Sequence, residues 1–416
     1  MSVTRASRPS GAGILLAATS VGGSHLLLAP EAGARFGYGL LWVVLLAHLV
    51  KYPAFEFGSR YALATGESLL DAYARARGPK GWALWLGLID MLLESIGVLA
   101  AITGLTASLL QAWFGGGLLM WSAVVAGSGV VLVLTGSARR LSRVCFSMMA
   151  VLALGTAAAF VAAPPSPSGV VQSLAPPRWP SGADWLIAAV LGWMPTGLGV
   201  SIWQSLWIVA QPVKTSMRSE ERVRLGLRGF RGGYLTSLVL ALVFLCLGAS
   251  VLEPAGIEPH GEAVAIALSS MYTKSVGEWF GPVFLTTAAF ALLSTVITCL
   301  DAFPRTLLET LRLLFPGRTW SSRARLSITV SYLSMAILGG GALLMAVPDP
   351  ERLILWLGAV TFLISPVYYA LNWLAVSRQI PDPALRPPRW LHALSAAGLL
   401  SLIWIAFRIL RAPLGG

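Results

Sequence analysis

The segment GWMPTGLG, residues 192–199, interrupts an apolar stretch that is otherwise long enough to cross a membrane as one helix. A proline in a helix interior costs about 3 kcal/mol and a glycine about 1 kcal/mol, so a regular helix should end here. A second segment, TSVGGSH at residues 19–25, places two adjacent glycines inside the first apolar stretch. In hydrocarbon, the backbone groups released at such breaks need other partners. The two segments therefore predict a pair of broken membrane helices.

The composition around these breaks is typical of an integral membrane protein. Apolar residues make up 56% of the 416 residues and charged residues 12%, whereas soluble domains carry about 25% charged residues. We therefore expect one all-helical transmembrane domain, residues 1–416, in a lipid bilayer. Stretches of about 20 apolar residues place eleven spans at 11–30, 37–57, 82–110, 117–136, 144–163, 184–210, 232–252, 276–301, 326–347, 353–377 and 390–410.

The basic residues predict how these spans are oriented. With the N-terminus in the cytoplasm, 23 of the 30 Lys and Arg residues fall in inside segments and six in outside segments, while Lys51 lies within a span. This asymmetry follows the positive-inside rule. It predicts a multi-pass protein of the plasma (inner) membrane with an outside C-terminus. The net charge of +12 is thereby explained without a nucleic-acid partner.

The two breaks fall in the first and sixth spans, five spans apart. This spacing is typical of inverted five-helix repeats, whose substrate lies where the half-helices end. The repeats would cover about residues 11–163 and 184–377, with an extra helix at about 390–410. The alternative is that these glycines and prolines only serve helix packing or a kink.

Several short motifs resemble the Nramp family of metal-ion transporters, which has the LeuT-type fold. The resemblance rests on AGARFGY at 32–38, LLW at 40–42, Arg60 with ATG at 64–66, ESIG at 94–97, Met194-Pro195, and STVIT at 294–298. It implies a LeuT-type inverted repeat with broken helices 1 and 6. The family's metal-binding Asp-Pro-Gly-Asn, however, falls on residues 22–25, which read GGSH. Its Met-Pro-His becomes Met-Pro-Thr at 194–196, and its proton-linked Asp of span 3 is displaced.

These departures change the expected substrate. A divalent ion in a low-dielectric site needs an anionic ligand, and no Asp or Glu is close to either break in the sequence. Amide groups at half-helix N-termini instead bind anions. We therefore expect a small inorganic anion, such as bicarbonate, to be transported, with no metal site. The expected substrate-binding residues are Thr19, Gly22, Gly23, Ser24, His25, Leu191, Met194, Pro195, Thr196 and Gly197. Divalent metal ions (manganese, iron or magnesium) and an amino acid held by its carboxylate are the alternatives.

Transport of an anion against a negative interior potential needs a driving ion, for which sodium and protons both remain open. By resemblance to LeuT-fold transporters, Ser294, Thr295 and Thr298 would hold sodium; alternatively these hydroxyls only join helices. Lys51 is expected to pair with Asp90 or Glu94. Lys51 and its partner would then form a neutralised buried pair. Alternatively, as the resemblance suggests for Glu94, these residues would form a proton path.

Other functional classes receive little support. The sequence has no zinc-protease, Cys-x-x-Cys, P-loop or dinucleotide-binding motif, so we expect neither an enzyme nor a cofactor. A lipid-modifying enzyme and a channel are the competing classes. A monomer is expected.

Overall fold

The computed structural model describes residues 22–135, 138–174, 178–211, 217–259 and 263–411, and every regular element within these ranges is a helix. Within these ranges, seven helices are long and apolar enough to cross a membrane, or eight if residues 147–162 and 167–174 form one bent span. Shorter apolar helices cover Leu118–Leu134, Asp184–Trp193 and Val200–Val209. The all-helical membrane fold is thereby confirmed for the described residues, whereas eleven spans remains a prediction.

The first break opens a half-helix that starts at Gly23. A π-helical turn, Ser24–Leu28, runs into α2, Ala29–Phe36. The helix therefore extends beyond residue 30, where the first span was expected to end. A 3₁₀ turn, Gly37–Leu40, leads into α3, Leu41–Thr65. Thr19, like the rest of the predicted first span before Gly22, lies outside the described residues.

The second break is confirmed at its predicted position. Helix α9 covers Asp184–Trp193 and helix α10 covers Val200–Val209. Met194 between them has an extended backbone, with φ −105° and ψ 130°. The carbonyl end of α9 and the amide end of α10 consequently both face the break.

The remaining helices are mostly longer than their predicted spans. They are α5 (Trp82–Phe114), α6 (Leu118–Leu134), α7 (Ala138–Ala162), α11 (Ser219–Leu247), α13 (Phe280–Leu314), α14 (Ser322–Ala346), α15 (Pro350–Arg378) and α16 (Arg389–Leu410). Helix α11 continues into a π turn at Gly248–Leu252 and a 3₁₀ turn at Glu253–Ala255, and a further 3₁₀ turn covers Pro383–Leu385. Three short helices were not predicted, because they fall in stretches interpreted as loops: α4 (Leu69–Ala74), α8 (Pro167–Leu174) and α12 (Val264–Ser275).

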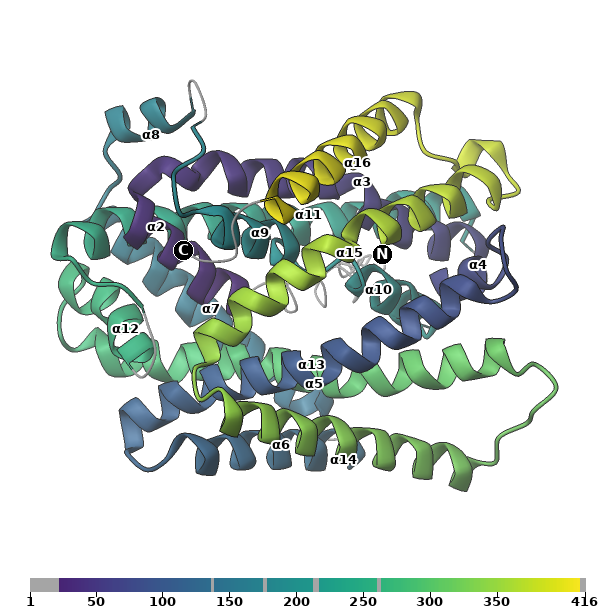
Figure 1. Ribbon diagram of the computed structural model, residues 1–416, viewed down its shortest axis with the longest axis horizontal. Coiled ribbons are helices and arrows are strands. Elements are labelled where there is room, and N and C mark those ends of the chain that lie inside the picture. The colour runs from purple at the N-terminus through teal and green to yellow at the C-terminus, as the bar shows by residue number, and fades with distance from the viewer. Residues whose placement is uncertain (1–21, 136–137, 175–177, 212–216, 260–262, 412–416) are drawn as a thin grey trace, which may run out of the picture.

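The helices surround the broken span from two sides (Figure 1). Helices α5, α6, α13 and α14 lie together at one side, while α3, α11 and α16 lie at the other. Helices α9, α10 and α15 lie between these groups, and α9 packs closely on α15. This packing brings the two halves of the broken span to the middle of the molecule.

Candidate functional site

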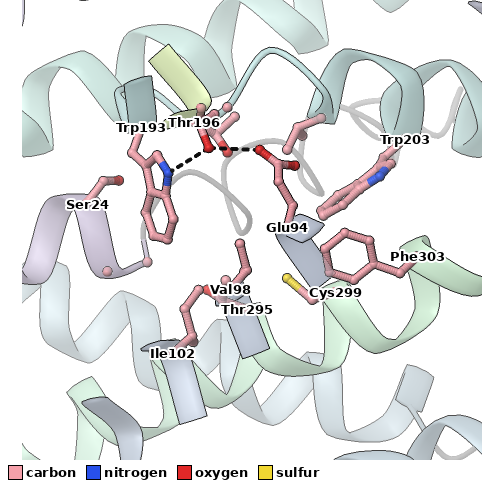
Figure 2. A pocket seen from close by; sticks show the side chains of 15 residues that line it. Ser24, Glu94, Val98, Ile102, Trp193, Thr196, Trp203, Thr295, Cys299 and Phe303 are labelled. Carbon is pink, nitrogen blue, oxygen red and sulfur yellow. Dashed lines mark hydrogen bonds between the residues drawn. The ribbon is translucent and has the colours of Figure 1, made fainter. Parts of the chain in front are cut away.

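A cavity of about 60 Å³ lies where the two breaks meet, with space for a few water-sized groups. Residues from both breaks and from α5, α13 and α15 line it (Figure 2). They are Gly22, Gly23, Ser24, Glu94, Val98, Ile102, Trp193, Thr196, Gly197, Val200, Trp203, Thr295, Cys299, Phe303 and Thr361. Five of the ten residues expected to bind substrate are among them: Gly22, Gly23, Ser24, Thr196 and Gly197.

The cavity contains a carboxylate, so the premise that none lies near either break is wrong. We call the interruption before Ser24 in the first span break 1, and the one between α9 and α10 in the sixth span break 6. Glu94 of α5 points into the space beside break 6 (Figure 2). A methyl group placed on Gly199 would lie 3.7 Å from Glu94 Oε2, so the carboxylate lies against the first turn of α10. A negative charge at the N-terminus of a helix is stabilised by the helix dipole. The sequence could not indicate this contact, because Glu94 is about a hundred residues away along the chain.

Hydrogen bonds fix Glu94 from α15. Thr361 Oγ1 donates to Glu94 Oε1 at 2.8 Å, and Trp193 Nε1 donates to Thr361 Oγ1 at 3.3 Å. One turn along α5, Asp90 accepts a hydrogen bond of 2.6 Å from Tyr368 of α15. The two carboxylates expected near Lys51 are therefore both held by α15.

The rest of the cavity wall is largely apolar. Trp193, Trp203 and Phe303 present aromatic rings, and Trp203 and Phe303 meet edge to face with centroids 4.9 Å apart. Cys299 is a buried free thiol whose sulfur points into the cavity (Figure 2). Apolar walls with a few placed polar groups are typical of sites for small organic molecules.

Lys51 contacts neither Asp90 nor Glu94, and the expected pair does not form. Its fully buried Nζ instead donates to four backbone carbonyls at the end of α9 and in the break. We call these four oxygens, from Leu191, Gly192, Met194 and Thr196, the carbonyl cup. The N···O distances are 3.0, 2.9, 2.9 and 2.7 Å. A cation at a helix C-terminus is stabilised by the helix dipole, so Lys51 compensates the carbonyl end of α9 much as Glu94 compensates the amide end of α10.

At break 1 the cavity is lined by the start of a half-helix. Residues 22–24 line the cavity at the point where the half-helix begins, and the first amide groups of a helix have no acceptor within that helix. The side chain of His25, expected to orient the ligand, lies elsewhere. Its Nε2 is 3.0 Å from the Ser237 carbonyl oxygen and 2.9 Å from Ser237 Oγ on α11, and the residue does not line the cavity.

The other predicted residues lie around the cavity rather than in it. Met194 and Pro195 do not line it, and the carbonyls of Leu191 and Met194 belong to the carbonyl cup. Of the three residues expected to hold sodium, only Thr295 reaches the cavity. The Thr298 hydroxyl donates to the Ser294 carbonyl of its own helix at 2.8 Å.

A metal centre of the usual kind is not present among the described residues. In that part of the chain, no three His, Cys, Asp or Glu side chains gather in a group that could hold a metal ion. Of the described residues that line the cavity, Glu94 and Cys299 have side chains able to supply an anionic ligand.

Comparison with known proteins identifies related sequences. The family model described as natural resistance-associated macrophage protein-like (Nramp) matches residues 13–411. An uncharacterized protein of Pasteurella multocida is 30% identical over 337 residues, which cover 78% of this chain and 75% of that protein. The divalent metal cation transporter MntH of Chromohalobacter salexigens is 33% identical over 173 residues, but these cover only 39% of this chain and 38% of MntH.

Solved structures show the same fold at low sequence identity. A manganese transporter of Eremococcus coleocola superimposes with a TM-score of 0.67 at 15% identity, covering 99% of this chain and 88% of that one. Mhp1, a nucleobase-cation-symport-1 family transporter, gives a TM-score of 0.61 at 15% identity, covering 97% and 92%. These likenesses extend over nearly the whole chain and support the LeuT-type arrangement around the broken helices.

Proposed function

Since this chain belongs to the Nramp family of membrane transporters, we propose that it is a secondary transporter of a small amino-acid-class solute. Such a solute carries a carboxylate next to an N–H group. One observation carries the proposal: the amide end of break 1 and the carboxylate of Glu94 line the same cavity. The two groups are complementary to opposite ends of this solute.

The carboxylate of the solute would bind at break 1. Gly22 and Gly23 have no side chain between the backbone and the cavity, so a small anionic group can approach the amides closely. The helix dipole adds to the attraction. Half-helix N-termini hold substrate carboxylates in the same way in LeuT-type transporters.

The N–H group of the solute would donate to Glu94. Charge-assisted hydrogen bonds are shorter and stronger than neutral ones, and the low dielectric of the site strengthens them further. The rings of Trp193, Trp203 and Phe303 would pack against the apolar part of the solute and against an ammonium group. The cavity thus supplies a partner for each part of the molecule.

Transport of a divalent metal ion is the alternative that the MntH relatives favour by name. Two observations count against it. Glycines occupy the positions of the family's metal-binding carboxylate and its neighbouring proline, and Lys51 already occupies the carbonyls at the end of α9. A metal ion would have to rely on Glu94 and Cys299. Bicarbonate was expected because no Asp or Glu is close to either break in the sequence. Glu94 lines the cavity, so this argument for bicarbonate no longer holds.

For the driving ion we propose a proton carried by Asp90, which lies one helical turn from Glu94 on α5, so that Glu94 stays ionised for the solute. Proton relays through membranes are built from such buried carboxyl groups. The Thr298 hydroxyl donates a hydrogen bond to the Ser294 carbonyl of its own helix. This contact favours a structural role for these hydroxyls over the expected sodium site. We define uptake as transport toward the side that carries the N-terminus, which the positive-inside rule predicts to be the cytoplasm.

Uptake into proteoliposomes would test the proposal. Labelled amino acids, N-acylated amino acids, bicarbonate and Mn²⁺ would each be offered with an inward proton gradient, an inward sodium gradient or none. We expect saturable, proton-stimulated uptake of at least one amino-acid-class solute. Saturable uptake of Mn²⁺ or of bicarbonate, with none of any amino-acid-class solute, would overturn the proposal.

Replacement of Gly22 by Asp should abolish uptake of that solute. The new carboxylate would stand at the amides that receive the solute's own carboxylate, and juxtaposed like charges cost several kcal/mol, so uptake should fall by about 100-fold or more. A Cβ at this position would also lie 2.9 Å from Thr295 Oγ1. Gly22→Ala, which introduces the same Cβ without charge, separates the steric effect from the electrostatic one. Equal uptake by the Asp and Ala variants would argue against a carboxylate site at break 1.

A further inference from the structure

The carbonyl cup has the chemistry of a cation site. Four oxygens from a single break converge on Lys51 Nζ at 2.7–3.0 Å. An ammonium has three N–H groups, so four acceptors satisfy it completely with one N–H shared. In the described part of the chain, no Asp or Glu forms an ion pair with Lys51; besides the cup, the Phe55 ring centroid lies 5.9 Å from Nζ.

The size and charge of the cup fit a monovalent ion. All four ligands are neutral carbonyl oxygens, the ligand type that replaces the hydration shell of K⁺ in selectivity filters. Their distances from Nζ are longer than the roughly 2.0–2.1 Å that Mg²⁺ requires and the roughly 2.3–2.6 Å typical of Ca²⁺. A divalent ion would also need an anionic partner that the cup does not provide.

We propose that the carbonyl cup is a monovalent-cation site that the protein fills with its own side chain. Lys51 reaches it from α3, a helix that packs against both halves of the broken span, and holds the ammonium where a free ion would bind. Lys51 is then a specificity-determining residue. It satisfies the carbonyls at the break permanently and keeps metal ions from using them as ligands.

The proposal leads to a chemical-rescue experiment. Lys51→Ala removes the ammonium and opens space for a free ion, so its melting temperature in detergent should fall by about 5 °C or more in choline chloride. Replacing choline with ammonium, methylammonium or potassium chloride at equal ionic strength should restore most of this loss. The wild-type protein should melt at the same temperature in all four salts.

Two further variants complete the experiment. Lys274→Ala removes an exposed lysine on α12 and should show no salt-specific shift. Lys51→Met fills the space with an apolar chain, so it should be destabilised but not rescued. The proposal would be overturned if Lys51→Ala responded to the four salts like Lys51→Met, or if no salt yielded folded Lys51→Ala protein.

This experiment measures ion binding by stability and does not depend on which solute is transported. If no amino-acid-class solute is taken up but the salts rescue Lys51→Ala, the proposed solute is rejected and the proposed cation site is retained. Successful uptake of an amino-acid-class solute without rescue would reject the cup alone.

Discussion

Glu94→Gln is expected to reduce uptake of the transported solute by about 10- to 100-fold while the protein remains folded. Glutamine has nearly the same shape and can still accept the hydrogen bond from Thr361, which is 2.8 Å long in the native protein. It lacks the negative charge, and hydrogen bonds to charged groups contribute about 1.5–3 kcal/mol, or roughly one to two decades in affinity. Initial uptake rates over a range of solute concentrations would measure the loss.

The matched controls separate charge from structure. Glu94→Asp keeps the charge on a shorter side chain and should recover part of the uptake. Glu309→Gln makes the same chemical change in an exposed ion pair with Arg312 on α13 and should transport normally. If Glu94 only bonded α5 to α15, the glutamine variant would transport like the native protein, and that outcome would contradict a role in binding the solute.

Gly192→Ala is expected to prevent α9 from packing on α15 and to lower the yield of folded protein sharply. A Cβ on Gly192 would lie 1.9 Å from the Gly358 carbonyl oxygen and 3.0 Å from Phe362 N, both backbone atoms of α15. Backbone cannot move aside as a flexible side chain can, so the two helices must separate. Overpacking of this kind costs about 3 kcal/mol or more. Melting temperature and monodispersity in detergent would report the effect.

Gly341→Ala provides the control for this prediction. Gly341 lies in α14, and a Cβ there meets no atom within 4 Å, so the substitution should be neutral or slightly stabilising because alanine favours helix by about 1 kcal/mol. Comparable destabilisation of the two variants would show that the contact between α9 and α15 is not the cause.

The parts of the fold that could be predicted are those that leave a local mark on the sequence. Pro195 interrupts an apolar stretch, so the break between α9 and α10 was predicted, and the half-helix after Gly22-Gly23 begins where the sequence indicated. The family was identified from short motifs near these positions. Helices α4, α8 and α12 were missed because they are short and border loops. A single apolar window does not distinguish a short helix lying beside the bundle from a loop.

The site was predicted less well, because its contacts join distant residues. The sequence places Glu94 and Lys51 in the bilayer but does not specify the helix face that each occupies. Opposite charges on neighbouring spans suggested a pair. The structure gives Lys51 four carbonyl partners instead, and carbonyls occur at every residue, so they carry no sequence signal. Because the sequence does not specify how each helix is rotated about its axis, it also did not predict that Glu94 faces the cavity or that His25 contacts Ser237.

The internal compensation at break 6 has a consequence for the transport cycle. Lys51 balances the cut end of α9, and Glu94 lies against the start of α10, so this broken span has fixed counter-charges of its own. The dipoles of its two half-helices are therefore compensated without a bound solute when the empty carrier returns to its starting state. We therefore expect the proposed carrier to reorient without solute, and so to accumulate its solute rather than exchange it one for one.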